Sequence, residues 1–180
     1  YLFSRKSQFI PVSRASQHVT QLVTRQDVEF KEGVLHVTFY WTKTRQSGGE
    51  PLIIPLVPVP GSPLCPVTAY FHMLHRVPAR PKDPLFVVPT TSGLKPIGYS
   101  LFHQILRAYL STIGLDSSQY SSHSFRRGGA TFAFSIGLPG ELIQSQGDWK
   151  SDAYKVYLEM DISDRVKVAK TMAHHVSRKC

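Results

Sequence analysis

A tyrosine that follows a group of cationic and hydrogen-bonding residues is the part of this sequence best suited to chemistry. His123 and Arg126 are three residues apart in a predicted helix, so both side chains lie on one face and can contact one phosphate. Trp149 adds an indole N–H, a donor only, and Tyr157 follows it. A tyrosine hydroxyl has a reference pKa of about 10 and needs cationic neighbours to attack a phosphodiester. This set predicts transfer of a DNA phosphodiester to protein without a metal.

Two tyrosines compete for the role of nucleophile. Tyr154 and Tyr157 are three residues apart in the short helix expected over residues 152–159, which places them side by side. Only one of them can attack, and their spacing does not choose between them.

The acidic and metal-ligating residues argue against metal-dependent chemistry. The chain has 12 aspartates and glutamates, without the clustering that holds two Mg²⁺ ions. His72 and His75 share a helix face, but only scattered cysteines and acids accompany them, so a packed or solvated face is favoured over a zinc site. We expect no metal and no cofactor, which disfavours a metal nuclease and a transposase of the DDE type.

The charge balance predicts a polyanionic partner. Lysine and arginine number 21 against 12 acidic residues, a formal charge of +9 spread along 180 residues. The alternative is a basic domain whose charge serves only solubility. Cys65 and Cys180 lie far apart, which favours a reducing intracellular setting over a disulfide framework. No stretch approaches the ~20 apolar residues of a membrane span, so no membrane partner is expected.

The elements that must position these residues are mainly helical. β-branched and aromatic residues predict strands within 28–56, forming a small antiparallel sheet with one long hairpin. Apolar spacing and Pro, Ser and Gly boundaries predict that residues 1–10 are the end of a buried helix stopped by Pro11. They predict further helices from Pro66 and over 98–113, 122–136, 139–146, 152–159 and 163–176. Residues 12–24 are expected as a connector, and 77–96 as a loop with one buried segment. The fold class is therefore α/β, mainly helical with a small antiparallel sheet.

Two further features concern the ends and the packing of this domain. The chain begins at Tyr1 in an apolar pattern with no cap or initiating methionine, so residues 1–180 are expected to be one domain cut from a longer protein. Gly128 and Gly129 interrupt a predicted helix, which indicates close approach of another backbone or a ligand.

Three motifs stand in order in the C-terminal third: His123-Ser-Phe-Arg126-Arg-Gly-Gly-Ala-Thr, then Gly147-Asp-Trp-Lys-Ser-Asp-Ala-Tyr, then Tyr157. In this order they resemble the tyrosine recombinase (phage integrase) superfamily. The second motif, with Leu-Pro-Gly-Glu-Leu-Ile-Gln before it, is similar to the recombinases of eukaryotic DIRS and Ngaro retrotransposons, with the Cryptons next. The resemblance covers nearly the whole chain and implies the catalytic-domain fold of that superfamily.

The resemblance also implies roles upstream of these motifs. Leu2-Phe-Ser-Arg5-Lys-Ser matches the helix of the family's first arginine, so Arg5 is implied to clamp the scissile phosphate with Arg126. Trp41-Thr-Lys43-Thr-Arg matches the hairpin lysine, so Lys43 is implied as the general acid for the leaving 5′ hydroxyl, with Arg45 or His123 as the alternatives.

The remaining positions are matched in the last motifs. His123 fits a proton-transfer or phosphate-binding role, and Trp149 fits the position that the family fills with histidine or tryptophan. Counting from Asp148 instead restores the commonest spacing to Tyr157, but an aspartate would repel phosphate. Crypton-like relatives resemble this stretch with phenylalanine at the position of Tyr154, which favours Tyr157 as the nucleophile and leaves Tyr154 as the alternative.

The implied activity is cleavage and rejoining of DNA strands through a 3′-phosphotyrosyl intermediate, in the integration or recombination of a mobile element. Double-stranded DNA is the implied partner, with a homodimer or homotetramer assembled on it, an N-terminal DNA-binding domain preceding this chain, and a nuclear location. Two alternatives stay open: a DNA-binding module derived from such an enzyme and no longer catalytic, and a type IB topoisomerase, which shares the chemistry but relaxes DNA as a monomer.

Overall fold

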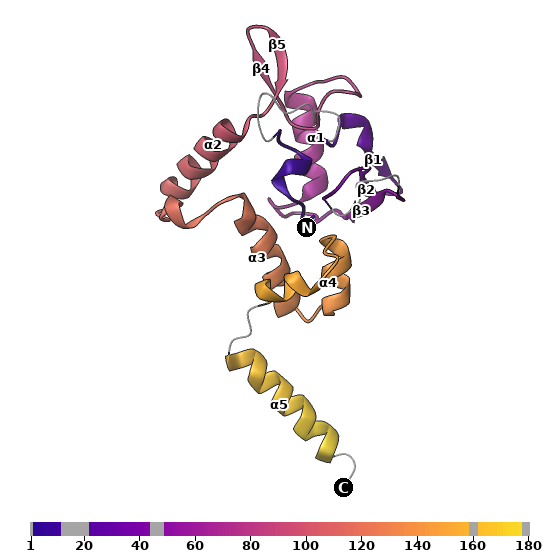
Figure 1. Cartoon of the computed structure of the whole chain (residues 1–180), viewed down its shortest axis with the longest axis vertical. Coiled ribbons are helices and arrows are strands. Elements are labelled where there is room, and N and C mark those ends of the chain that lie inside the picture. The colour runs from indigo at the N-terminus through magenta and orange to yellow at the C-terminus, as the bar shows by residue number, and fades with distance from the viewer. Residues whose placement is uncertain (1, 12–21, 44–48, 159–161, 178–180) are drawn as a thin grey trace.

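The computed structural model describes residues 2–11, 22–43, 49–158 and 162–177. Figure 1 shows a body that contains the sheet, a smaller helical group of α3 (Ser122–Ser135) and α4 (Gly140–Gln146), and α5 (Ile162–Ser177), which extends away from both. The expected fold class is confirmed: the domain is α/β, mainly helical, with a small antiparallel sheet.

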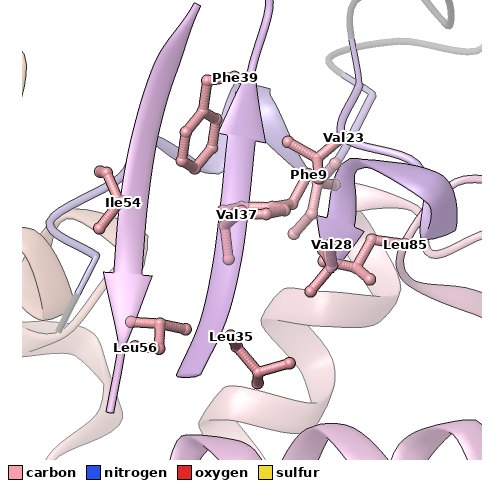
Figure 2. Packing of buried hydrophobic residues seen from close by; sticks show 10 residues of the cluster. Phe9, Val23, Val28, Leu35, Val37, Phe39, Ile54, Leu56 and Leu85 are labelled. Atoms are coloured by element: carbon pink, nitrogen blue, oxygen red, sulfur yellow. The ribbon is translucent and has the colours of Figure 1, made fainter. Parts of the chain in front are cut away.

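The body is built on a three-stranded antiparallel sheet of β1 (Val28–Lys31), β2 (Val34–Phe39) and β3 (Leu52–Leu56), in that order. Burial alternates along β2, as expected for a strand with one covered face. Leu35 and Phe39 on the covered face are both 1% exposed. Figure 2 shows these side chains gathered with those of the neighbouring strands into one apolar core.

Helix α1 (Pro66–Arg76) covers this core, as its apolar spacing predicted. Val67, Tyr70 and Met73 pack against the buried cluster of the sheet. The hydroxyl of Tyr70 also donates to the carbonyl of Val28 at 3.3 Å, which ties the helix to the first strand.

Residues 77–96 differ from the expected loop. They contain a two-stranded hairpin of β4 (Val87–Thr90) and β5 (Gly93–Pro96). Gly93 has a φ of 104°, which a residue with a side chain rarely adopts. Proline is tolerated here because each strand of a two-stranded ladder is an edge strand. The expected buried segment is present, since Leu85 and Val87 are 5% and 7% exposed.

Residues 2–10 do not form the buried helix that the apolar pattern of the N-terminal segment predicted. The described part is irregular except for a 3₁₀ turn at Lys6–Gln8, and Phe3 has a φ of 48°. The reason lies in the packing: Leu2 and Phe9 contact the sheet core, whereas Phe3 packs against a second cluster beside α3. Side chains directed to two separate cores cannot share one helix face.

The helices that follow have nearly the expected limits. α2 (Tyr99–Thr112) and α3 are each followed, two residues after their last helical residue, by a glycine: Gly114 with a φ of 75° and Gly137 with a φ of 86°, as is common just beyond a helix end. Ser121 caps α3 by accepting from the backbone N–H of His123 at 3.2 Å. Pro139 precedes α4, as expected.

The last expected helices are also present, but the first of them has a different geometry. Asp152–Tyr157 forms a 3₁₀ helix capped by Ser151, and residues three apart are eclipsed in such a helix. α5 has approximately the limits expected for it. Within the described residues, no helix is both long and apolar enough to cross a membrane. The predicted connector at residues 12–24 lies mostly outside the described residues.

Candidate phosphate-binding and nucleophile site

A small cavity of about 110 Å³ lies where the N-terminal segment meets the first turns of α3. Its lining is polar and cationic, and consists of Ser4, Arg5, Lys6, Ser7, Ser122, His123 and Arg126. The structure therefore brings together three of the six residues predicted from sequence, Arg5, His123 and Arg126. Lysine and arginine side chains with hydroxyl groups form a typical set of donors for an anion.

Arg126 is held rigidly at the inner wall of this cavity. Its guanidinium donates to the carbonyl of Phe3 and to that of Gly147, the latter at 2.7 Å. It also stacks on the ring of Trp149, 3.7 Å from the ring centroid. The residue is 4% exposed. These contacts fix the direction of the guanidinium before any ligand arrives.

The surroundings of Arg126 alter its acidity without removing its charge. Burial is the main cause that lowers its pKa to about 10, and the neighbouring positive charge of Arg5 adds to this effect. Tyr157 and Asp148 act in the opposite direction. Because the pKa stays well above neutrality, Arg126 remains a cation at pH 7.

Arg5 lies at the outer wall and is held more loosely. Its backbone N–H donates to the side-chain oxygen of Gln8 at 2.7 Å, which anchors the main chain at the start of the 3₁₀ turn. Its guanidinium forms an ion pair with Asp148 at 4.0 Å. Arg5 thus reaches the cavity although the helix predicted around it is absent.

Trp149 packs against Arg126 and belongs to a second apolar cluster, whose buried members are Ala130, Ala133, Ile143, Trp149 and Tyr154. It is 9% exposed and its ring centroid lies 6.4 Å from that of Phe3. Gly147 is required beside it, because a Cβ at that position would collide with the indole ring. In this structure the tryptophan ring therefore stacks on the guanidinium of Arg126, whereas Trp149 itself is not among the residues that line the cavity.

The two candidate tyrosines differ in their surroundings. Both rings flank Trp149, with centroid distances of 6.1 Å for Tyr154 and 6.0 Å for Tyr157. Tyr154 is 4% exposed, and its hydroxyl packs against Gly140, where an added Cβ would lie only 2.7 Å away. Tyr157 is half-buried, and its carbonyl accepts a hydrogen bond from the hydroxyl of Thr131 at 2.5 Å.

The two remaining predicted residues are exposed. His123 lines the cavity from the first turn of α3. Lys43 lies in a turn after β2, and in the part of the chain that the structure describes it makes no hydrogen bond or ion pair with the other five. Arg45, the alternative general acid, lies outside the described residues.

The sequence did not indicate every residue that lines the cavity, and the neighbour expected beside the paired glycines of α3 was wrong. Lys6 lines the cavity, and its ammonium lies 3.4 Å from the ring centroid of Tyr99. The sequence feature that could have indicated Lys6 as a cavity residue is its position next to Arg5. The close approach expected at the paired glycines is confirmed for Gly129, but the partner is the ring of Phe3, 2.7 Å from an added Cβ. Gly128 has no such neighbour within 4 Å.

No metal cluster is found in the described part of the chain, because no three His, Cys, Asp or Glu residues there are close enough to hold an ion.

Comparison with solved structures identifies the fold. Two crystal structures of the XerH site-specific recombinase match this chain, one bound to difH substrate in a pre-cleavage complex and one bound to palindromic difH substrate in a post-cleavage complex. The TM-scores are 0.60 and 0.61 at 12% identity, over 94% and 97% of this chain. The chain spans 43% of the length of these recombinases. The fold is thus the one predicted, that of a tyrosine recombinase catalytic domain.

The sequence matches no established protein-family profile and no curated protein. The structural likeness at 12% identity therefore concerns the fold.

Proposed function

We propose that this chain is the catalytic domain of a recombinase that cleaves and rejoins double-stranded DNA through a 3′-phosphotyrosyl intermediate, with Tyr157 as the nucleophile. The observation that carries the proposal is the cavity in which Arg5, His123 and Arg126 meet, with Arg126 stacked on the tryptophan that Tyr157 flanks. The solved structures of similar fold, which are recombinases bound to their DNA substrates, support DNA as the partner.

The cavity suits one phosphate. Arg5 comes from the N-terminal segment and Arg126 from α3, so two arginines from different elements line the space that one anion would occupy. Such groups bind phosphate oxygens through charge-assisted hydrogen bonds, and they stabilise the extra negative charge of a pentavalent transition state. Arg126 needs little reorganisation, since two carbonyls and an indole ring already hold it.

The reaction itself is a balanced exchange of two phosphate esters. The Tyr157 oxygen forms a bond to phosphorus while the bond to the 5′ oxygen breaks, and the tyrosine proton is lost as a proton is gained by the leaving oxygen. We assign the general acid to Lys43 and a proton-transfer or phosphate-binding role to His123. The phosphotyrosine ester retains the bond energy, so a second 5′ hydroxyl reseals the strand without ATP.

Burial supports Tyr157 over Tyr154 as the nucleophile. A nucleophile must present its hydroxyl to the substrate, and the hydroxyl of Tyr154 is enclosed against Gly140 within the apolar cluster. Tyr157 lies at the edge of the same cluster and is only half-buried. We assign Tyr154 a role in packing against the ring of Trp149.

The apolar surfaces support assembly of more than one protomer on DNA. An apolar groove of about 750 Å³ lies against α3 and α4, and its lining includes Phe132, Ile136, Leu138 and Leu142. Helix α5 extends away from the helical group of α3 and α4 in Figure 1. Its apolar side chains Ile162, Val166, Val168 and Met172 are exposed. We propose that α5 of one protomer occupies the groove of another, in a dimer or tetramer.

The biological setting follows from the sequence motifs. We propose integration or recombination of a eukaryotic mobile element of the DIRS or Ngaro type, in the nucleus. We further propose an N-terminal DNA-binding domain in the full protein, as the resemblance of the sequence motifs implies.

A nicked duplex that traps the covalent intermediate tests this function. With EDTA present, the protein should become linked to the 3′ end of the cleaved strand, seen as a labelled band that resists denaturation. Loss of the adduct on chelation would contradict the mechanism, and DNA binding with no adduct under any condition would favour the non-catalytic module. Among active proteins, strand exchange indicates a recombinase, whereas relaxation of supercoils by a monomer indicates a topoisomerase.

A further inference from the structure

A carboxylate lies beside the arginines of the candidate phosphate site. The side chain of Asp148 is 11% exposed and pairs with Arg5 at 4.0 Å. The residue directly follows Gly147, whose carbonyl binds Arg126, and directly precedes Trp149, on which Arg126 stacks. A negative charge at this place opposes the binding of a phosphate, so its presence calls for a physical explanation.

The backbone holds this carboxylate in place. Asp148 has a φ of 53°, a left-handed conformation that is uncommon for a residue with a side chain. Its N–H donates to the carbonyl of Ser145 at 3.1 Å, which fixes the turn that ends α4. The turn therefore directs the carboxylate toward Arg5 instead of leaving it in solvent.

The two arginines need such a counter-ion when DNA is absent. Arg5 and Arg126 line the same small cavity and repel each other, and Asp148 attracts both. Their attachment differs, however. Arg126 is fixed by two carbonyls and a ring, whereas the side chain of Arg5 is 23% exposed and its ion pair lies at the outer limit of such contacts. A partly exposed pair of this length is weak enough to open.

We propose that Asp148 is a positioning residue, an internal counter-ion that holds Arg5 beside Arg126 in the free protein and releases it to the DNA phosphate on binding. The inference rests on the proposed function, since it takes a DNA phosphodiester as the anion that enters the cavity. Exchange of the carboxylate for the phosphate has two opposite effects. Asp148 weakens DNA binding because it competes for Arg5, and it speeds cleavage because Arg5 is already in place.

Asp148→Asn tests this role with little risk to the fold. Asparagine has the same shape and tolerates the left-handed backbone, but it lacks the charge. The matched control is Asp152→Asn, which removes an equal charge at a position four residues after Asp148. Asp152 is exposed, and its carboxylate pairs with Lys155 at 2.7 Å. Circular dichroism and a thermal melt verify that both variants are folded.

Two measurements separate the competing explanations. Binding to an uncleaved duplex should be about three- to ten-fold tighter for Asp148→Asn than for Asp152→Asn, because only the first change removes a competing carboxylate from the phosphate site. Formation of the covalent adduct in a single turnover should be about ten-fold slower for Asp148→Asn, because Arg5 is no longer pre-positioned. A residue with a merely structural role would weaken binding and slow cleavage together.

The outcomes distinguish this inference from the proposed function. If the unaltered protein forms the adduct and the two variants bind and react alike, the role of Asp148 is refuted and the function stands. If the unaltered protein binds DNA without forming an adduct and Asp148→Asn still binds more tightly than Asp152→Asn, the counter-ion role stands and the catalytic function is refuted. Weaker binding by Asp148→Asn in either case refutes the inference.

Discussion

Arg126 combines a buried position with a retained charge, and this combination depends on its particular partners. Two backbone carbonyls and an indole ring replace much of the hydration that the guanidinium loses on burial. Both carbonyls come from segments distant in sequence, so the charge is positioned only when the N-terminal segment and the loop after α4 are folded against α3.

Replacement of Arg126 should therefore affect catalysis far more than replacement of an exposed residue outside the cavity. Arg126→Ala is expected to lower the rate of adduct formation by about 10²–10³, the usual loss when one preorganised donor to a transition state is removed. His72→Ala is the control, since His72 is an exposed residue of α1 that contacts Arg76. Single-turnover assays on a nicked duplex measure both rates, and equal rates would show that Arg126 does not act on the phosphate.

Lys43 poses a different question, because the structure places it on an exposed turn. If Lys43 protonates the leaving 5′ oxygen, Lys43→Ala should cleave ordinary DNA slowly but should be largely rescued by a substrate with a 5′ sulfur, which leaves without a proton. Lys6→Ala is the natural comparison, because Lys6 lines the cavity and would contribute to phosphate binding. Rescue of Lys6→Ala but not of Lys43→Ala would transfer the general-acid role to Lys6.

At the scale of elements, helix and strand signals in the sequence located most of the fold. β2 and β3, α1, and the helices from α2 to α5 were predictable because proline, serine and glycine mark many of their ends and apolar residues recur at strand or helix spacing. The N-terminal segment was not, because Phe3 and Phe9 pack against different clusters, a choice that only tertiary structure makes. The hairpin of β4 and β5 was missed because its prolines are read as loop signals.

Some contacts of the candidate site could also be predicted from the sequence, and others could not. The pairing of His123 with Arg126 follows from helix geometry and was predictable. The ion pair of Arg5 with Asp148 joins residues far apart in sequence and was not. The burial of Tyr154 could likewise not be predicted from its spacing to Tyr157, since both tyrosines flank Trp149 and differ in how deeply the fold buries them.

The paired glycines of α3 give a test at this scale. Gly128→Ala should stabilise the domain by about 1 kcal/mol, because alanine favours a helix and an added Cβ meets nothing within 4 Å. Gly129→Ala should leave the domain about 1–3 kcal/mol less stable than Gly128→Ala, because its Cβ would displace the ring of Phe3. Denaturant unfolding of the two variants measures this difference. Equal stabilities would mean that Phe3 does not pack on α3 as described.

At the scale of the whole molecule, the charge of +9 should govern the affinity for DNA. Contacts to phosphates supply affinity without sequence preference, so this chain alone should bind duplex DNA on the order of 10⁻⁴–10⁻⁶ M at physiological salt. Affinity should fall steeply with rising salt, because releasing the condensed counter-ions into a more concentrated solution gains less entropy. Fluorescence anisotropy over a salt series measures the slope. Binding that is independent of salt, or strongly selective for sequence, would argue against this view.

The central claim, that Tyr157 becomes covalently linked to DNA, is tested most directly by identifying the linked residue. A suicide duplex is incubated with the protein, the adduct is digested with protease and nuclease, and mass spectrometry locates the tyrosine that carries the nucleotide phosphate. We expect the label on Tyr157, loss of the adduct in Tyr157→Phe with DNA binding retained, and an adduct still formed by Tyr154→Phe. A label on Tyr154, or an adduct that persists in Tyr157→Phe, would contradict the account.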